Sequence, residues 1–132
     1  MSKTVCVTGS SRGIGKAIAI EFAKHGYRVV INCVQRRDSL EETKAKIEAL
    51  GVPCLALVGD VGDEVFVREM FARSKEAFGG IDVLVNNAGI SYVGLLTDMT
   101  AKEWERIVRT NLTSAFLCAR EAIPDMVHKK AG

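Results

Sequence analysis

The sequence of 132 residues predicts an α/β fold built on a doubly wound parallel sheet. Short apolar runs alternate with longer segments whose apolar residues recur every three or four positions, which is the pattern of strands connected by amphipathic helices. Gly26, Gly51 and the pair Gly79 and Gly80 each follow a helical segment and precede the next apolar run, where helices commonly end. Right-handed crossovers then make neighbouring strands parallel.

Four apolar runs are expected to be strands, at residues 5–8, 28–32, 54–58 and 82–86. Each is rich in Val, Leu, Ile or Cys at successive positions, so both faces of the sheet need helical cover. The helices expected between the strands span residues 14–25, 39–50 and 63–78.

A last helix is expected from about Ala101 to about Ala122 or slightly beyond. Thr100 is its predicted cap, and Glu103, three residues later, completes a capping box. Pro124 is expected to bend or end this helix, because proline lacks the N–H group that a helix interior uses.

The composition indicates one domain with a real core, since 48% of the residues are hydrophobic. A formal net charge of +2, with dispersed basic residues, gives no reason to expect a nucleic acid or a membrane surface as partner. No long uncharged apolar run is present, so we expect a cytoplasmic protein. The cysteines lack C-x-x-C spacing and are expected to be reduced core thiols, with no metal site: Cys6, Cys33, Cys54 and Cys118.

Three glycines lie where the first strand turns into the first helix, in the segment 8–15. Glycine has no Cβ, so the chain can turn tightly and a pyrophosphate can approach the backbone, while the following helix directs its free N–H groups toward the phosphates. The spacing of Gly9, Gly13 and Gly15 therefore predicts a dinucleotide-binding turn. A merely flexible loop is the alternative.

Two more polar clusters follow strands. Asn86-Asn87-Ala88-Gly89 closes the fourth strand, and Asp60-Val61 follows the third. Ligands bind at this carboxyl edge of an open α/β sheet, where amides could meet a ribose and Asp60 could meet an adenine amino group. The alternatives are an Asn-rich turn and, for Asp60, a cap for the helix starting near Asp63.

Together these motifs resemble those of the short-chain dehydrogenase/reductase family. Thr8-Gly9-x-x-x-Gly13-x-Gly15, Asp60-Val61, Asn86-Asn87-Ala88-Gly89 and Asn111 match its motifs in order and spacing, and the likeness covers the entire chain. Residues 11–15 and 81–118 are most similar to the 3-oxoacyl-[acyl-carrier-protein] reductases, which act in fatty acid biosynthesis. The resemblance implies a Rossmann-type sheet in the order 3-2-1-4.

The resemblance also implies where a cofactor lies and which residues bind it. The pyrophosphate lies at the glycine turn, the adenine near Asp60 and Val61, and the ribose and nicotinamide near the fourth strand. The implied cofactor-binding residues are Gly9, Ser11, Arg12, Gly13, Ile14, Gly15, Asp60, Val61, Asn87, Ala88 and Gly89. Asn111 corresponds to the family's catalytic asparagine, whose backbone carbonyl holds a water in a proton relay. A side-chain-to-backbone or helix-kinking asparagine is the alternative.

The second strand favours NADP(H) over NAD(H). An NAD-specific protein usually places an acidic residue about 20 residues past the glycines. Here no acid occurs before Asp38, whereas Arg12, Arg36 and Arg37 could bind a 2′-phosphate through their guanidinium groups. Solvated loop arginines are the alternative.

The catalytic Ser and Tyr-x-x-x-Lys of the family have no counterpart. Tyr27 is followed four residues later by Ile31, and Tyr92 by Leu96. Residues 1–132 are therefore expected to be the N-terminal part of a single dinucleotide-binding Rossmann domain, truncated before the fifth strand. We expect this polypeptide to be inactive and to bind dinucleotide weakly or not at all. The resemblance implies a small carbonyl or acyl-carrier-protein-linked substrate for a full-length form.

The unpaired fourth strand and the last helix are expected to make the chain a homo-oligomer. The apolar residues Ile107, Phe116 and Ile123 would form the contact, and Trp104 is expected to serve packing. Two other functions remain open: a noncatalytic nucleotide-binding or interaction module, and an unrelated flavodoxin-like domain. The flavodoxin-like alternative gives no reason for the Asn-rich motif or Asn111.

Overall fold

The computed structural model describes residues 2–132 and contains one four-stranded parallel sheet. The order β3-β2-β1-β4 confirms the predicted 3-2-1-4 arrangement. The parallel pairs place Val5 opposite Val29 on one side and Val83 on the other. The strand bounds are β1 (Thr4–Val7), β2 (Arg28–Cys33), β3 (Cys54–Val58) and β4 (Val83–Val85).

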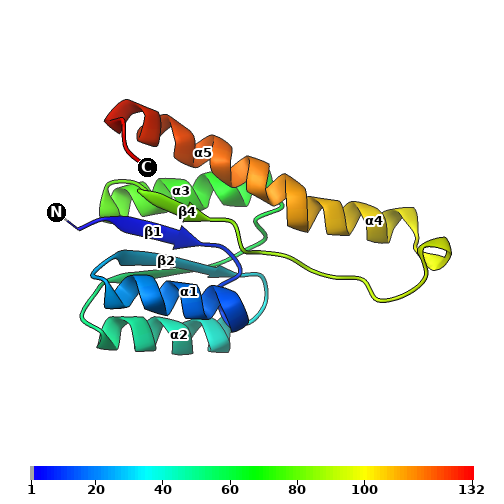
Figure 1. Ribbon diagram of the computed structural model, residues 1–132, viewed down its shortest axis with the longest axis horizontal. Coiled ribbons are helices and arrows are strands. Elements are labelled where there is room, and N and C mark those ends of the chain that lie inside the picture. The colour runs from blue at the N-terminus through cyan, green and yellow to red at the C-terminus, as the bar shows by residue number, and fades with distance from the viewer. Residues whose placement is uncertain (1) are drawn as a thin grey trace.

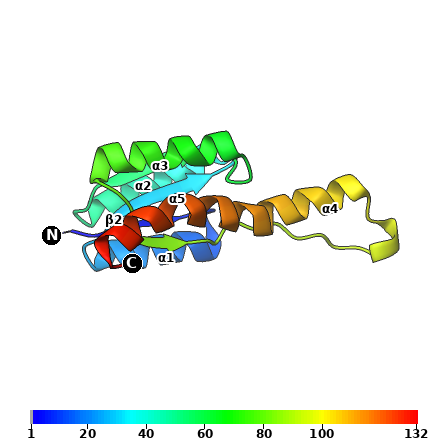
Figure 2. The ribbon, with the colours of Figure 1, turned by 90° about the horizontal axis from the view of Figure 1, so that it is seen from above.

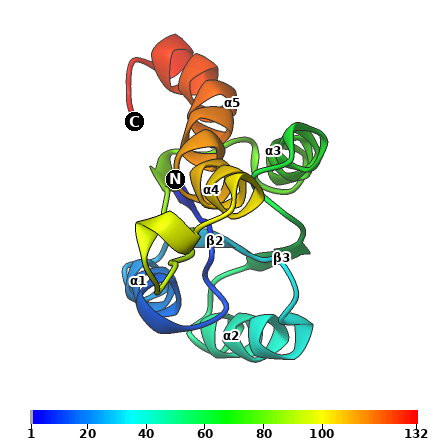
Figure 3. The same ribbon diagram turned by 90° about the vertical axis from the view of Figure 1, so that its right-hand side faces the viewer.

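Helices cover both faces of the sheet, as the apolar strands require (Figures 1 and 3). One layer contains α1 (Gly13–Lys24) and α2 (Arg37–Ala49), and the opposite layer contains α3 (Glu64–Phe78) and α5 (Ser114–Lys129). Successive residues of β1 point to opposite layers, so Val5 and Val7 belong to one core cluster and Cys6 to the other.

Two helix starts differ in detail from the expected positions. Helix α2 begins at Arg37 instead of residue 39, and its N-cap residue Arg36 makes no side-chain cap bond. Helix α3 is capped by Asp63, whose carboxylate accepts a hydrogen bond from the N–H of Val65 at 3.0 Å. Asp60 is therefore not the N-cap of this helix, and the alternative role considered for it is wrong.

The last helical region is interrupted, which the sequence suggested only through the helix-kinking alternative for Asn111. Helix α4 (Ala101–Val108) passes into a π-helical turn, η2 (Arg109–Thr113), before α5 begins. Pro124 was expected to bend or end this helix; it lies inside α5, which continues to Lys129, so it does not end the helix. Pro124 itself is exposed, and the carbonyl four residues before it loses its helical N–H partner.

The predicted cap of α4 is confirmed. The hydroxyl of Thr100 accepts from the N–H of Glu103 at 3.1 Å and contacts the carboxylate of Glu103 at 3.0 Å. Helix α4 and the segment before it, which contains the short 3₁₀ helix η1 (Leu96–Asp98), form an arm that extends beyond the sheet (Figures 1 and 2). None of the helices in the described part of the chain has the length and apolar character needed to cross a membrane.

Candidate functional site

A cleft of about 740 Å³ lies at the carboxyl edge of the sheet. Loops that follow all four strands line it, and α4 forms a further wall. The loop after β1 contributes Gly9, Ser11 and Arg12, and the segment from the end of β2 contributes Cys33, Val34, Gln35 and Arg36. The remaining lining residues are Asp60, Asn87, Ala88, Gly89, Ile90, Lys102, Glu105, Arg106, Arg109 and Thr110.

The glycine turn packs closely against the loop after β4. Gly9 has a positive φ of 61°, and a Cβ there would lie 2.9 Å from the Cα of Ala88. A Cβ on Gly15 would overlap both the side-chain nitrogen of Asn87 and the carbonyl oxygen of Gly9. These two positions need glycine because two backbone segments meet there, which is a tighter arrangement than a freely flexible loop.

Thr8 and Asn87 fasten these two loops to each other. The hydroxyl of Thr8 accepts from the backbone N–H groups of Asn87 at 3.0 Å and Ala88 at 2.9 Å. In return, the Nδ2 of Asn87 donates to the carbonyls of Thr8 at 3.2 Å and Gly9 at 2.9 Å. The Nδ2 of Asn87 therefore already donates to two backbone carbonyls, and it holds the loop after β4 against the glycine turn.

The residues after β3 face the cleft in different ways. Asp60 lines it, and its Oδ1 accepts from the N–H of Gly62 at 2.8 Å, which fixes the carboxylate. The side chain of Val61 is only 1% exposed and belongs to the core beneath α3 and α5. Any contact of Val61 with a ligand in the cleft must therefore use its backbone.

Asn111 lies in the π-helical turn and binds the loop after β4. Its Oδ1 accepts from the N–H of Ile90 at 2.7 Å, and its Nδ2 donates to the carbonyl of the same residue at 2.8 Å. This pair of hydrogen bonds is the side-chain-to-backbone role that the sequence left open for Asn111. The π-helical turn is the accompanying helix irregularity. The contact joins the α4–α5 junction to the Asn-rich loop.

Several predicted site residues do not line the cleft: Gly13, Ile14, Gly15, Val61 and Asn111. Ile14 is 75% exposed, whereas Gly15 acts through the close approach described above. Other residues of the site were not predicted from the sequence. Asn32 is buried near the end of β2, and the signal that could have located it is an amide side chain within an apolar strand. On α4 and the first residue of η2, the signal was a spacing of four and three residues between Lys102, Arg106 and Arg109, which is typical of one helical face.

The side chains that line the cleft carry a net positive charge. Five cations line it against two carboxylates, so its formal charge of about +3 exceeds the +2 of the whole chain. Among residues 2–132, none of the five lies within 4.0 Å of a carboxylate oxygen. Elsewhere, ion pairs are formed by Lys16, Lys24, Lys46, Arg68, Lys75, Arg120 and Lys129. Such a field attracts anions.

The cysteines are free, buried thiols, as expected. Burial raises the pKa of Cys54 to about 12 and that of Cys118 to about 12, and it raises the pKa of Cys6 further. Burial also raises the pKa of Cys33 at the cleft, although a backbone hydrogen bond near Arg36 opposes the shift. The described residues contain no group of His, Cys, Asp and Glu side chains that could hold a metal ion.

Comparison with known proteins identifies the family. The family model described as short chain dehydrogenase matches residues 3–132. The chain belongs to the short-chain dehydrogenase family. A crystal structure of a candidate short-chain alcohol dehydrogenase from Sinorhizobium meliloti matches this short-chain dehydrogenase with a TM-score of 0.90 and 39% identity, covering 97% of this chain and 51% of that one.

Curated relatives agree with this assignment. The 3-oxoacyl-[acyl-carrier-protein] reductase FabG of Staphylococcus epidermidis is 41% identical over the whole chain, and that of Staphylococcus aureus is 39% identical. An uncharacterized oxidoreductase YhxC of Bacillus subtilis is 38% identical over 98% of the chain. This short-chain dehydrogenase spans about half the length of these relatives, namely 54% of each FabG protein and 45% of YhxC.

Proposed function

We propose that this short-chain dehydrogenase binds NADP(H) weakly in the cleft and supplies the cofactor-binding part of a carbonyl reductase. The observation that carries the proposal is that the loops closing β1 to β4 share one cleft. The residues fit a dinucleotide, since Gly9, Ser11 and Arg12 of the glycine turn line the cleft and the cleft carries unpaired cations. Gly9 and Ser11 would hold the pyrophosphate, and Asp60 the adenine. A bound nicotinamide would supply the hydride.

The choice of NADP(H) over NAD(H) rests on charge. Arg12 and Arg36 come from different loops and line the same cleft, where guanidinium groups suit a 2′-phosphate. Arg37 is the first residue of α2 and is not among the lining residues, so we assign the 2′-phosphate to Arg12 and Arg36 alone.

Titration with NADPH and NADH tests this assignment. Arg12→Ala and Arg36→Ala should each weaken NADPH binding about tenfold, which is about 1.4 kcal/mol, and NADH binding far less. Arg73→Ala is the matched control, because Arg73 is an exposed, unpaired arginine on α3 outside the cleft. Equal losses for both coenzymes would refute the NADP(H) assignment, and no binding by the unchanged protein would refute the proposed cofactor site.

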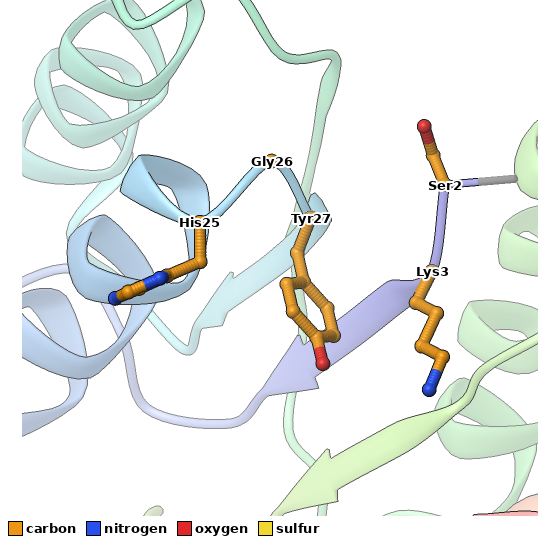
Figure 4. Close-up of a pocket in the computed structure, with 5 residues that line it drawn as sticks. All are labelled: Ser2, Lys3, His25, Gly26 and Tyr27. Carbon is orange, nitrogen blue, oxygen red and sulfur yellow. The ribbon is translucent and has the colours of Figure 1, made fainter.

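The proposed reaction is hydride transfer between the cofactor and a ketone or alcohol. Because the FabG relatives are named 3-oxoacyl-[acyl-carrier-protein] reductases, the substrate class in this proposal is a 3-oxoacyl thioester carried by acyl carrier protein. Within the site, Asn111 would orient the loop after β4 through Ile90, and its backbone carbonyl would hold a proton-relay water. Neither Tyr27 nor Tyr92 is followed four residues later by a lysine. Tyr27 lies just before β2, near Lys3 at the start of the chain (Figure 4).

A noncatalytic nucleotide-binding or interaction module is the second candidate. It is favoured by the absence of a Tyr-x-x-x-Lys pair from the 132 residues. We accordingly expect this polypeptide to leave a 3-oxoacyl thioester unreduced in the presence of NADPH, which absorbance at the reduced coenzyme band measures. Turnover would show that another group donates the proton.

Self-association and a cytoplasmic location belong to the same proposal. Within residues 2–132, β4 pairs with β1 alone, which leaves one edge open, and the side chains of Phe116 and Ile123 on α5 are 58% and 51% exposed. Trp104 on α4 is exposed too, so its expected packing role requires a second copy. Free buried cysteines are typical of proteins in a reducing compartment.

A further inference from the structure

We propose that Asn32 is a positioning residue that holds the loop after β1 and the end of β3 against β2, and thereby sets how strongly the cleft prefers NADPH to NADH. Asn32 is 1% exposed and lies near the end of β2, beneath the floor of the cleft. The inference rests on the proposed cofactor and adds a residue that does not touch the cofactor itself.

The side chain of Asn32 connects the loop after β1 to the end of β3 and the loop that follows it. Its Oδ1 accepts from the N–H of Gly9, in the turn after β1, at 3.4 Å. Its Nδ2 donates to the carbonyls of Leu57 at 3.2 Å and Gly59 at 3.1 Å, at the end of β3. A third contact, at 3.4 Å, reaches the carbonyl of Cys33 in β2. Both polar atoms of this buried amide are therefore used.

The backbone of Asn32 extends the connection beyond the end of β1. Its N–H donates to the hydroxyl of Ser10 at 3.0 Å, and its carbonyl accepts from the N–H of Ser10 at 2.8 Å. The Ser10 hydroxyl itself donates to the carbonyl of Val7 at 2.6 Å. The glycine turn is thus attached to β2 through both the backbone and the side chain of one residue.

This attachment fixes two arginines relative to each other. Arg12 follows the turn held by Gly9 and Ser10, and Arg36 follows Asn32 by four residues. Both line the cleft. Loss of the amide would leave the carbonyls of β3 unsatisfied and loosen the two loops, so the arginines would no longer be held ready for one phosphate. NADH lacks that phosphate and should suffer less.

The test compares Asn32→Ala with Ser74→Ala. Ser74 is also a buried polar residue, but its hydroxyl donates to the carbonyl of Met70 at 2.7 Å within α3, away from the cleft. Fluorescence titration gives the affinities for NADPH and NADH, and urea unfolding gives the stability. We expect Asn32→Ala to weaken NADPH binding about tenfold and NADH binding at most about threefold, and Ser74→Ala to change neither.

A purely structural role would give a different result. The inference is overturned if Asn32→Ala lowers the stability but leaves the ratio of the two affinities unchanged. If the unchanged protein binds neither coenzyme, the proposed function fails, and a second measurement still tests the positioning role.

That measurement is amide hydrogen exchange of the unchanged protein, which also applies if Asn32→Ala does not fold. The amides of Gly9, Ser10 and Gly59 should open with one common free energy, because Asn32 links their loops. Independent opening of Gly9 and Gly59 would overturn the inference.

Discussion

Replacement of Gly15 by alanine tests the contact on which the cleft depends. Gly15 is buried near the start of α1, and an added methyl group would overlap the Nδ2 of Asn87 and the carbonyl oxygen of Gly9. It would also lie 3.0 Å from the Cα of Ser10. Since Asn87 donates to Gly9 at 2.9 Å, the methyl group would press against both partners of an existing hydrogen bond.

The expected magnitude follows from two opposing effects. Alanine is favoured over glycine inside a helix by about 1 kcal/mol. Overpacking a closed site costs about 1–3 kcal/mol, and we take the upper end because two of the three overlapped atoms belong to the backbone. The net loss in the free energy of unfolding is therefore about 2 kcal/mol, which lowers the melting temperature by roughly 5–10 °C.

Urea unfolding and coenzyme titration on the same variant provide the assay. Gly15→Ala should be less stable and should bind NADPH more weakly, because the loops after β1 and β4 are pushed apart. Gly51→Ala is the control: its φ of 91° costs about 1 kcal/mol, but nothing lies within 4 Å of the added Cβ, so coenzyme binding should be unchanged. A Gly15→Ala variant that is as stable as the unchanged protein would refute the reasoning.

Three further outcomes are expected. The pKa of Cys54 is raised from 9.0 to about 12 in the folded state, so the protonated thiol contributes fully to the free energy of unfolding below pH 9 and this contribution is lost as pH rises toward 12. Cys54→Ala should therefore flatten the fall in the free energy of unfolding over that range, as urea unfolding at several pH values would measure. Thr100→Ala should reduce the helicity of α4 and cost about 1 kcal/mol, as circular dichroism and urea unfolding would measure; unchanged helicity would contradict the cap assignment. Light scattering should find a dimer or larger assembly that Phe116→Glu with Ile123→Glu dissociates, whereas a monomeric unchanged protein would count against self-association.

The sheet could be predicted because its signals are local. Apolar runs and helical spacing gave the four strands and the helices, and the parallel order followed from the family resemblance. The start of α2 was misplaced because Arg36 provides no side-chain cap to mark it. The π-helical turn could not be predicted because it accompanies the contact of Asn111 with Ile90, two residues far apart in the sequence.

The candidate site was partly predictable for the same reason. Motifs at strand ends located Gly9, Asp60 and Asn87, since parallel strands bring their carboxyl ends to one edge. The wall formed by α4 could not be located, because its place over the cleft depends on the path of the extended segment before it. Asn32 was read as part of an apolar strand, and only the three-dimensional arrangement reveals its partners.

The position of β1 in the sheet has a consequence for synthesis on the ribosome. β1 meets β2 across 24 residues of sequence, as in the contact of Arg28 with Thr4, but it meets the start of β4 only across 78, as in the bond from Thr4 to Asp82. The nascent chain therefore emerges with its central strand half paired until the fourth strand leaves the exit tunnel. Throughout that interval one side of β1 is an unpaired strand edge, to which a strand of another chain could add.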